Sequence, residues 1–342
     1  MDSVLALGGA HLCYTMEGAD MKSASSTHYT LAVRQLKHEL TRVNSGEESD
    51  PVRLLLTILL LSTTESISAN SQGVIFHHLR ASSHFIPSLL ALDPNHGDQE
   101  IRAFLIETYA YMVSVANITV NTQPTYPALI LDPCITGLER FQDCKASGMM
   151  FGYARNLLTL LPSICMLGYN RTLEENAGKY SFENIAWYKA LQFKIESWQE
   201  PSTSEDSGND IKDLVVASKV YKEAILIFLH TAFYGSKVGD PELLSLIDTS
   251  LSKTSSFFGF GTDSPVLSVM LWPCMIIGSC LRESVARQYL RGKMLETRFN
   301  MTLVLRSVQL LDWLWEDNAL DAYGPYGLGI VMRKHGIMHS MS

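Results

Sequence analysis

Residues 220–235 read VYKEAILIFLHTAFYG, and this stretch decides the fold class of the chain. Nearly all of its residues are apolar, it contains no proline, and Gly235 stands where a helix C-cap favours glycine. Lys222, Glu223 and His230 are its only strongly polar side chains, and no two of them have the spacing of metal ligands. We therefore expect a buried helix without chemistry of its own.

The same helical period recurs along the rest of the chain. Apolar residues three or four positions apart predict helices, whereas no run of alternating apolar and polar residues predicts a strand. The expected helices cover residues 29–43, 51–67, 74–92, 98–116, 149–166, 182–198, 210–234, 241–252, 265–281, 283–297 and 300–316. Residues 1–342 are thus expected to form a single all-α domain of antiparallel packed helices joined mostly by short loops, with no sheet.

Local signals mark several boundaries. Residues 25–27, Ser-Ser-Thr, are expected to cap the first of these helices, and Asp50-Pro51 is expected to open the next as N-cap and first helical residue. The segment EPSTSEDSGND at 200–210 has no large apolar residue and is predicted to be a flexible surface loop. Residues 118–147, which hold three prolines, are expected to be the least regular part. The glycines of GPYGLG, residues 324–329, fit a C-terminal loop.

Composition limits the classes of function. The 342 residues are 46% hydrophobic and carry a formal charge of −8, so the core is ample and no disulfide or metal is needed for stability. Nucleic-acid binding rests on lysine and arginine, so an acidic chain is a poor candidate for direct DNA contact. The most basic stretch, residues 282–298, also contains Glu283 and Glu296 and is predicted to be a solvated helix face.

The cysteines predict neither disulfides nor zinc. None of the six forms a C-x-x-C pair, so a zinc cluster and a zinc finger are excluded, and the thiols are expected to be small buried groups in a reducing compartment. These cysteines are Cys13, Cys134, Cys144, Cys165, Cys274 and Cys280. No signal peptide is visible. The apolar run 265–281 contains Pro273 and is predicted to be a core helix rather than a membrane span.

No cluster of side chains nominates a catalytic, cofactor-binding or metal site. His77, His78 and His84 lie close in sequence, but His78 is expected on a different helix face from the other two, and ordinary helix histidines are favoured. Glu65 and Glu107 lie on apolar helices and are expected to be paired or solvated. GFGTDS at 259–264 lacks the third glycine of a dinucleotide fingerprint and is predicted to be a turn between helices. The five tryptophans are expected to pack in the core; they are Trp187, Trp198, Trp272, Trp313 and Trp315.

Seven segments, in order, resemble the regulatory domain of fungal zinc-cluster transcription factors. They are LLLTILLLSTTE (54–65), HHLRASSHFI (77–86), FGYARNLLTLLPSI (151–164), IESWQEP (195–201), YKEAILIFLH (221–230), LWPCMIIGSC (271–280) and NMTLVLRSVQLLDWLWED (300–317). In the second segment, Ala81 and Ser82 stand where the family usually has Gly-Ala. The zinc cluster that precedes this domain in the family is absent from this chain.

The resemblance implies a non-enzymatic regulator of transcription in the nucleus, controlling a metabolic or secondary-metabolite gene set. It would act through protein partners, namely the transcription machinery or a DNA-binding regulator, or through a small-molecule effector. No cofactor, membrane contact or direct DNA contact is expected, and a homodimer is compatible with the sequence. Two alternatives remain open at this point. One is a helical enzyme or small-molecule-binding protein of a biosynthetic pathway, and the other is a gene product whose upstream exon encodes the zinc cluster.

Overall fold

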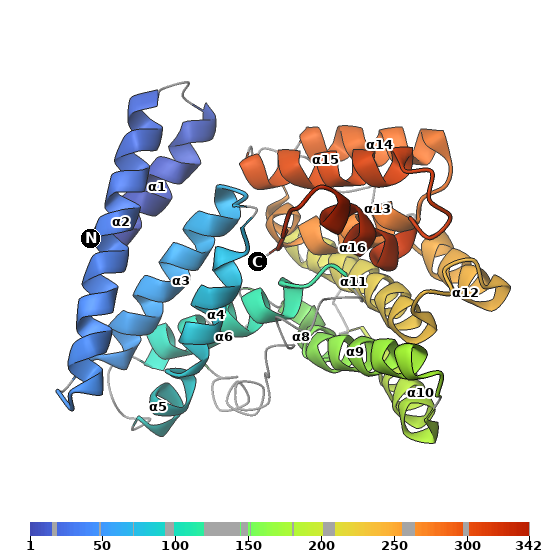
Figure 1. Ribbon diagram of the computed structural model, residues 1–342, viewed down its shortest axis with the longest axis horizontal. Helices are drawn as coiled ribbons and strands as arrows, with labels where there is room; N and C mark the ends of the chain where they lie inside the picture. Colours follow the sequence, from blue (N-terminus) through green and yellow to red (C-terminus); the bar gives the residue numbers. More distant parts are fainter. Residues whose placement is uncertain are drawn as a thin grey trace.

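The computed structural model describes residues 1–341 except 16–18, 48, 71, 93–98, 120–143, 145–149, 151, 180, 201–208, 255–263 and 297–300. Within these residues every regular element is a helix, and one isolated parallel bridge joins Gln72 to Met338 (Figure 1). The all-α prediction is therefore confirmed. None of the helices in the described part combines the length and hydrophobicity that crossing a bilayer requires.

The N-terminal helices form one side of the molecule. They are α1 (Asp2–Thr15), α2 (Ala19–Asn44), α3 (Pro51–Ile67), α4 (Val74–Ser83), α5 (Ile86–Ala91) and α6 (Gln99–Val115). The α1 and α2 helices lie side by side at one edge of the molecule, and both pack on α3 (Figure 1). One face of α3 buries Leu54 and Ile58 against α2, while its Leu55 and Leu59 enter the main core. Because α3 is covered on two sides, most of its surface is apolar, which explains its leucine-rich sequence.

The other helices form a second group, in which most elements pack on α11. They are η2 (Gly152–Ala154), α8 (Arg155–Leu158), α9 (Leu161–Ala177), α10 (Phe182–Glu196), α11 (Asn209–Tyr234), α12 (Pro241–Ser252), η4 (Pro265–Val269), α13 (Leu271–Cys280), α14 (Ser284–Leu295), α15 (Thr302–Glu316) and α16 (Gly324–Lys334). The α11 helix packs against α9, α10, α12, α13 and α16, and every residue from Glu223 to Ala232 is buried. A helix with neighbours on all sides needs apolar residues all round, which explains the composition of 220–235.

Proline positions explain where the predicted helices are divided. Pro87, Pro162 and Pro273 lie inside ranges predicted as continuous helix, and each stands in the first turn of a new helix instead. A proline there removes no hydrogen bond, because the first N–H groups of a helix have no partner within it. The single helices predicted over 74–92, 149–166 and 265–281 were therefore wrong.

Three further sequence predictions need correction. Residues 25–27 lie within α2, where the Ser25 hydroxyl donates to the Ala6 carbonyl oxygen and ties α2 to α1 at 2.8 Å. The three- and four-residue spacing of apolar residues in 182–198 predicts a buried face that begins at Phe182, but Phe182 is 88% exposed because it is the first residue of α10. GPYGLG is helical rather than a loop. Gly324 has φ +63° at the helix start, and a Cβ on Gly327 would lie 2.6 Å from the Ala322 carbonyl carbon, so close packing requires glycine there.

Other boundaries were predicted well. Asp50 caps α3 by accepting a hydrogen bond from the Val52 N–H at 2.9 Å, and α12 covers the predicted residues 241–252. Most of the irregular segment 118–147 and residues 201–208 of the predicted loop lie outside the described residues. The last two residues of that loop belong to α11.

Candidate functional site

The three strongly polar residues in the C-terminal half of α11 point to two different places. His230 is buried inside the core, whereas Lys222 and Glu223 line a pocket at the edge of α11. This pocket has a volume of about 560 Å³. Its lining residues are Trp198, Gln199, Glu200, Lys219, Lys222, Glu223 and Lys253. Three charged side chains of α11 therefore meet the residues that follow α10 and α12.

Lys222 fixes one wall of the pocket. Its ammonium group donates to the Glu196 carbonyl oxygen at 3.0 Å and to the Trp198 carbonyl oxygen at 3.1 Å. It also lies 5.9 Å from the centre of the Trp198 ring. A cation is favourable at the C-terminal end of a helix, where carbonyl groups have no partner within the helix. Lys222 thus binds the end of α10 to α11 and positions Trp198.

Glu223 is the least satisfied polar group of the pocket. It is 6% exposed, and the Lys253 ammonium lies 3.8 Å from its Oε1 atom, which is too long for a hydrogen bond. Its Oε2 atom is buried and has no hydrogen-bond partner among the described residues. A buried carboxylate oxygen without a donor is costly, so Glu223 brings an unsatisfied acceptor to the wall of this pocket. The other carboxylate, Glu200, forms a 2.6 Å ion pair with Lys219.

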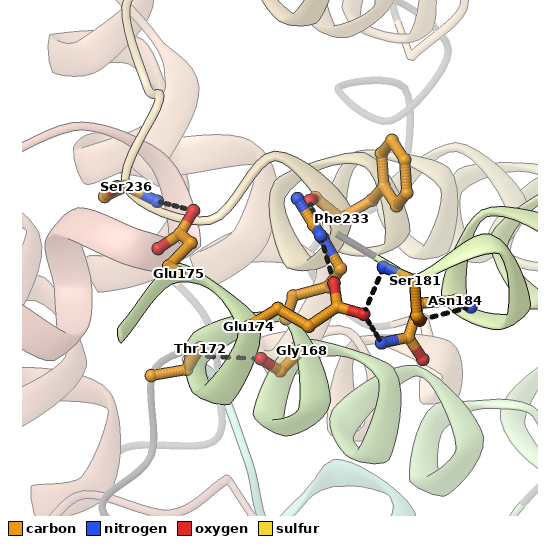
Figure 2. A network of polar contacts seen from close by, with 9 residues as sticks. Gly168, Thr172, Glu174, Glu175, Ser181, Asn184, Phe233 and Ser236 are labelled. Atoms are coloured by element: carbon orange, nitrogen blue, oxygen red, sulfur yellow. Dashed lines mark hydrogen bonds and ion pairs between the residues drawn. The ribbon is translucent and has the colours of Figure 1, made fainter. Parts of the chain in front are cut away.

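A polar network joins α9, α10 and α11 where α9 ends and α10 begins (Figure 2). The Glu174 carboxylate at the end of α9 accepts from the Ser181 N–H at 2.9 Å and from the Asn184 amide at 2.7 Å, and it forms an ion pair with Arg171. The Arg171 Nε–H donates to the Phe233 carbonyl oxygen of α11 at 2.9 Å. We call Arg171, Glu174, Ser181 and Asn184 the clasp. The clasp joins α9 to α10 and, through the Phe233 carbonyl oxygen, to α11. Burial opposes ionisation of Glu174, but hydrogen bonds from Ser181, Arg171 and Asn184 lower its pKa.

His230 lies next to the clasp and shares a hydrogen bond with the Tyr188 hydroxyl at 2.9 Å. The Tyr188 ring stacks on the Phe233 ring with 4.1 Å between ring centres. The Arg171 guanidinium lies over the same Phe233 ring, 5.0 Å from its centre. Burial lowers the pKa of His230 to about 4, so the imidazole is neutral near pH 7. This histidine therefore positions α10 on α11 as an uncharged core group.

The three histidines weighed in the sequence do not converge. His78 and the Tyr29 hydroxyl form a 2.9 Å hydrogen bond between α4 and α2, and burial lowers the pKa of His78. His84 follows α4 as its C-cap and, like His77, is exposed. Across the described ranges no three His, Cys, Asp or Glu side chains gather as metal ligands.

The two acids nominated by the sequence are buried and have partners. Glu107 is 1% exposed and accepts a hydrogen bond from the Met150 N–H at 3.0 Å. Glu65 is 8% exposed, and after burial its carboxylate is the main cause that raises the pKa of Tyr29. Both carboxylates have partners, which is one of the two arrangements that the sequence led us to expect.

Cys165, Cys274 and Cys280 are buried as predicted, whereas Cys13 and Cys144 are only partly buried, and the tryptophans pack in or against the core. Burial raises the pKa of Cys165, Cys274 and Cys280 to about 12 in each case, so these thiols are poor nucleophiles. Cys134 lies outside the described residues. Trp272 is 1% exposed and donates to the Asn117 carbonyl oxygen at 2.9 Å, and Trp315 donates to that of Gly278 at 3.0 Å. The other three tryptophans pack half-buried against the core.

Most of the basic stretch 282–298 lies in α14, and its described arginines contact neighbouring elements as well as solvent. Arg287 donates to the Leu281 carbonyl oxygen at 2.8 Å, and Arg291 pairs with Asp312 of α15 at 3.2 Å. A groove of about 500 Å³ is lined by residues of α14 and α15, which pack against each other. In this groove Leu295 and Leu305 are 38% and 44% exposed. Arg298 and residues 259–263 of GFGTDS lie outside the described residues.

Sequence reasoning identified Lys222 and Glu223 as unusual but missed the pocket. Lys219, Lys222 and Glu223 share one face of α11 by their three- and four-residue spacing, which is a readable signal. The contributions of Trp198 and Lys253 depend on how α10 and α12 end against α11, and no local pattern reports that arrangement.

Comparison with known proteins places the chain in a family. The model of a family described as fungal specific transcription factor domain matches residues 1–323. No match was found among curated proteins or among solved structures.

Proposed function

The chain belongs to the fungal specific transcription factor domain family, and on that premise we propose that it controls a metabolic or secondary-metabolite gene set from the nucleus. The family is one of transcriptional regulators and not of enzymes. The observation that carries the proposal is the match over residues 1–323, together with the all-α fold. The mechanism we propose is contact with protein partners, or a ligand-biased change passed to such a partner.

Charge supports action through a protein partner rather than through DNA contacts of this chain. The formal charge is −8, whereas DNA affinity grows with the number of phosphates that lysine and arginine neutralise. On α14, the most basic helix, Arg291 pairs with Asp312 and Arg287 bonds the backbone. The exposed Leu295 and Leu305 beside them offer apolar surface for a protein contact.

The pocket at Glu223 supports ligand sensing. It is formed where α11 meets the ends of two other helices, so a ligand there contacts several elements at once. A ligand shifts a conformational equilibrium only when it binds the two states with different affinity. Groups supplied by three helices provide such a difference whenever the helix ends move relative to α11.

The enzyme alternative would require convergent catalytic groups, and the pocket does bring Glu200 and Glu223 together. Glu200, however, is 47% exposed and paired with Lys219. Among the described residues, the lining contains no histidine, serine or cysteine that could act as a nucleophile with a base. The groups favour binding over catalysis.

Gene disruption in the source fungus tests the regulatory proposal. We expect transcripts of a coherent metabolic gene set to change and to recover when the intact gene is returned, with a fluorescent fusion of the protein in the nucleus. Unchanged transcripts under all growth conditions in which the gene is expressed would refute the proposal.

Two measurements on purified protein test its other parts. A gel-shift assay against promoter DNA should show no specific complex, and a specific, steeply salt-dependent complex would overturn the absence of DNA contact. We also propose that residues 1–342 form one domain able to homodimerise. Light scattering after gel filtration gives the mass, and a monomer at micromolar concentration would contradict the homodimer.

A further inference from the structure

We propose that the pocket at Glu223 binds a small carboxylic acid that also carries a hydroxyl or ammonium group. The proposal names the effector class, and its regulatory meaning rests on the proposed function, whereas the binding itself does not. It starts from the groups in the pocket that lack a good partner.

The first requirement on the ligand is a hydrogen-bond donor. Glu223 is 6% exposed, its Oε2 atom has no hydrogen-bond partner within the described part of the chain, and its Oε1 atom has only the Lys253 ammonium at 3.8 Å. A buried carboxylate is strongly favoured when a hydroxyl or ammonium group donates to it. A ligand without a donor would leave this buried oxygen unsatisfied.

The second requirement is negative charge. The described residues that line the pocket include three lysines and two glutamates, so these side chains carry a net formal charge of +1. Lys219 and Lys253 are 50% and 56% exposed at the rim, where an anion can reach them. A simple cation would meet three ammonium groups, and a simple anion would meet Glu223. A ligand with both an acidic group and a donor satisfies both sides.

The size and walls of the pocket limit the ligand further. A volume of about 560 Å³ falls in the range of small-molecule sites. The half-buried Trp198 provides a flat apolar wall, held in place because Lys222 binds the backbone at the end of α10. Lys222 has one N–H left beyond its two carbonyl partners, which can also bind a carboxylate oxygen.

Calorimetric titration of the purified full chain with three acids tests the proposal. L-malate and L-aspartate carry a hydroxyl and an ammonium group on the same carbon skeleton as succinate, which has no donor. We expect at least one of the first two to bind and succinate to bind about tenfold or more weakly, because a site built around an acceptor rejects the analogue without the donor. Which of the two binds distinguishes a hydroxy acid from an amino acid.

The variant Glu223→Gln should reduce affinity for the preferred acid about tenfold and remove most of the discrimination against succinate. Glu183→Gln, which changes an exposed acid on α10, is the matched control and should bind like the original chain. Melting curves of both variants verify that they remain folded.

Three outcomes overturn the proposal: no binding of any of the three acids, equal binding of succinate, or equal weakening by Glu183→Gln. The first would mean that water is the partner of Oε2. Transcript measurements separate this proposal from the proposed function. If the acid binds but gene disruption changes no transcripts, the binding proposal stands and the proposed regulatory function is refuted. If transcripts change but no acid binds, the regulatory function stands and the binding proposal is refuted.

Discussion

Removing the Glu174 carboxylate should be among the most damaging single changes to this fold. The variant Glu174→Ala leaves three donors without their acceptor, namely the Arg171 guanidinium, the Ser181 N–H and the Asn184 amide. The Arg171 and Glu174 side chains are 5% and 12% exposed, so water can replace the lost acceptor only in part. Breaking a buried pair costs about 3–5 kcal/mol, and we expect a loss of about 3 kcal/mol.

That loss corresponds to a measurable change in melting temperature. With about 2.1 cal/mol/K of unfolding entropy per residue, a chain of 342 residues should melt about 4 °C lower. The neighbouring Glu175 offers a matched control, because it accepts one long hydrogen bond of 3.3 Å from the Ser236 N–H. Glu175→Ala should lower the melting temperature by less than about 1 °C.

The dependence on pH and on Arg171 sharpens the test. The pKa of Glu174 is lowered in the folded chain, so its contribution is present above the ordinary value of 4.5 and is lost as pH falls through the folded value. The difference between the original chain and Glu174→Gln should therefore shrink in acid. In a double-mutant cycle with Arg171→Met, the two changes should show a coupling of about 1 kcal/mol or more. Equal effects of Glu174→Ala and Glu175→Ala, or a coupling near zero, would refute the role of the clasp.

Three further predictions follow from local geometry. Burial lowers the pKa of His230 to about 4, so between pH 6.5 and 4 the unfolded histidine binds a proton while the folded one does not. The free energy of unfolding should therefore fall by about 3 kcal/mol over this pH range. In denaturant titrations, His230→Gln should make this pH dependence weaker. Gly327→Ala should lower the melting temperature, because its Cβ would lie 2.6 Å from the Ala322 carbonyl carbon. Gly292→Ala on α14 should raise the melting temperature, because its Cβ would meet nothing within 4 Å and alanine favours a helix. A change of the same sign in both variants would contradict the packing argument. Asp50→Ala removes the cap of α3 and should cost about 1 kcal/mol, measured by thermal melting, with no loss if the Val52 N–H finds another partner.

The sequence predicts best where the deciding interaction is local. Asp50 and Asp240 each precede a proline and each accept a hydrogen bond from a backbone N–H two residues later, so the starts of α3 and α12 can be read directly. The length of α11 follows from an apolar run bounded by Gly235, whose φ is +58°. These signals act within a few residues and do not depend on the rest of the fold.

The sequence predicts poorly where distant packing overrides local preference. Glycine weakens an isolated helix, which made GPYGLG look like a loop, yet α16 forms because Gly327 lets the chain approach Ala322 and Leu314 closely. The pocket has the same character. Lys222 reaches the Trp198 carbonyl oxygen across 24 residues of sequence, and Lys253 approaches Glu223 from the end of another helix. Residue spacing along α11 alone carries no information about either contact.

The stretch 220–235 thus has two roles in one helix. From Glu223 to Ala232 it is buried on every side, so shifting this segment would disrupt contacts with α9, α10, α12, α13 and α16 together. The groups at its edge are less constrained, because Trp198 and Lys253 lie beyond the last residues of α10 and α12, Trp198 is only half-buried and Lys253 is 56% exposed. A ligand at Glu223 is therefore expected to act on these helix ends against a fixed α11. If hydrogen exchange with bound ligand slowed in the middle of α11 and not at Trp198 and Lys253, this division of roles would be wrong.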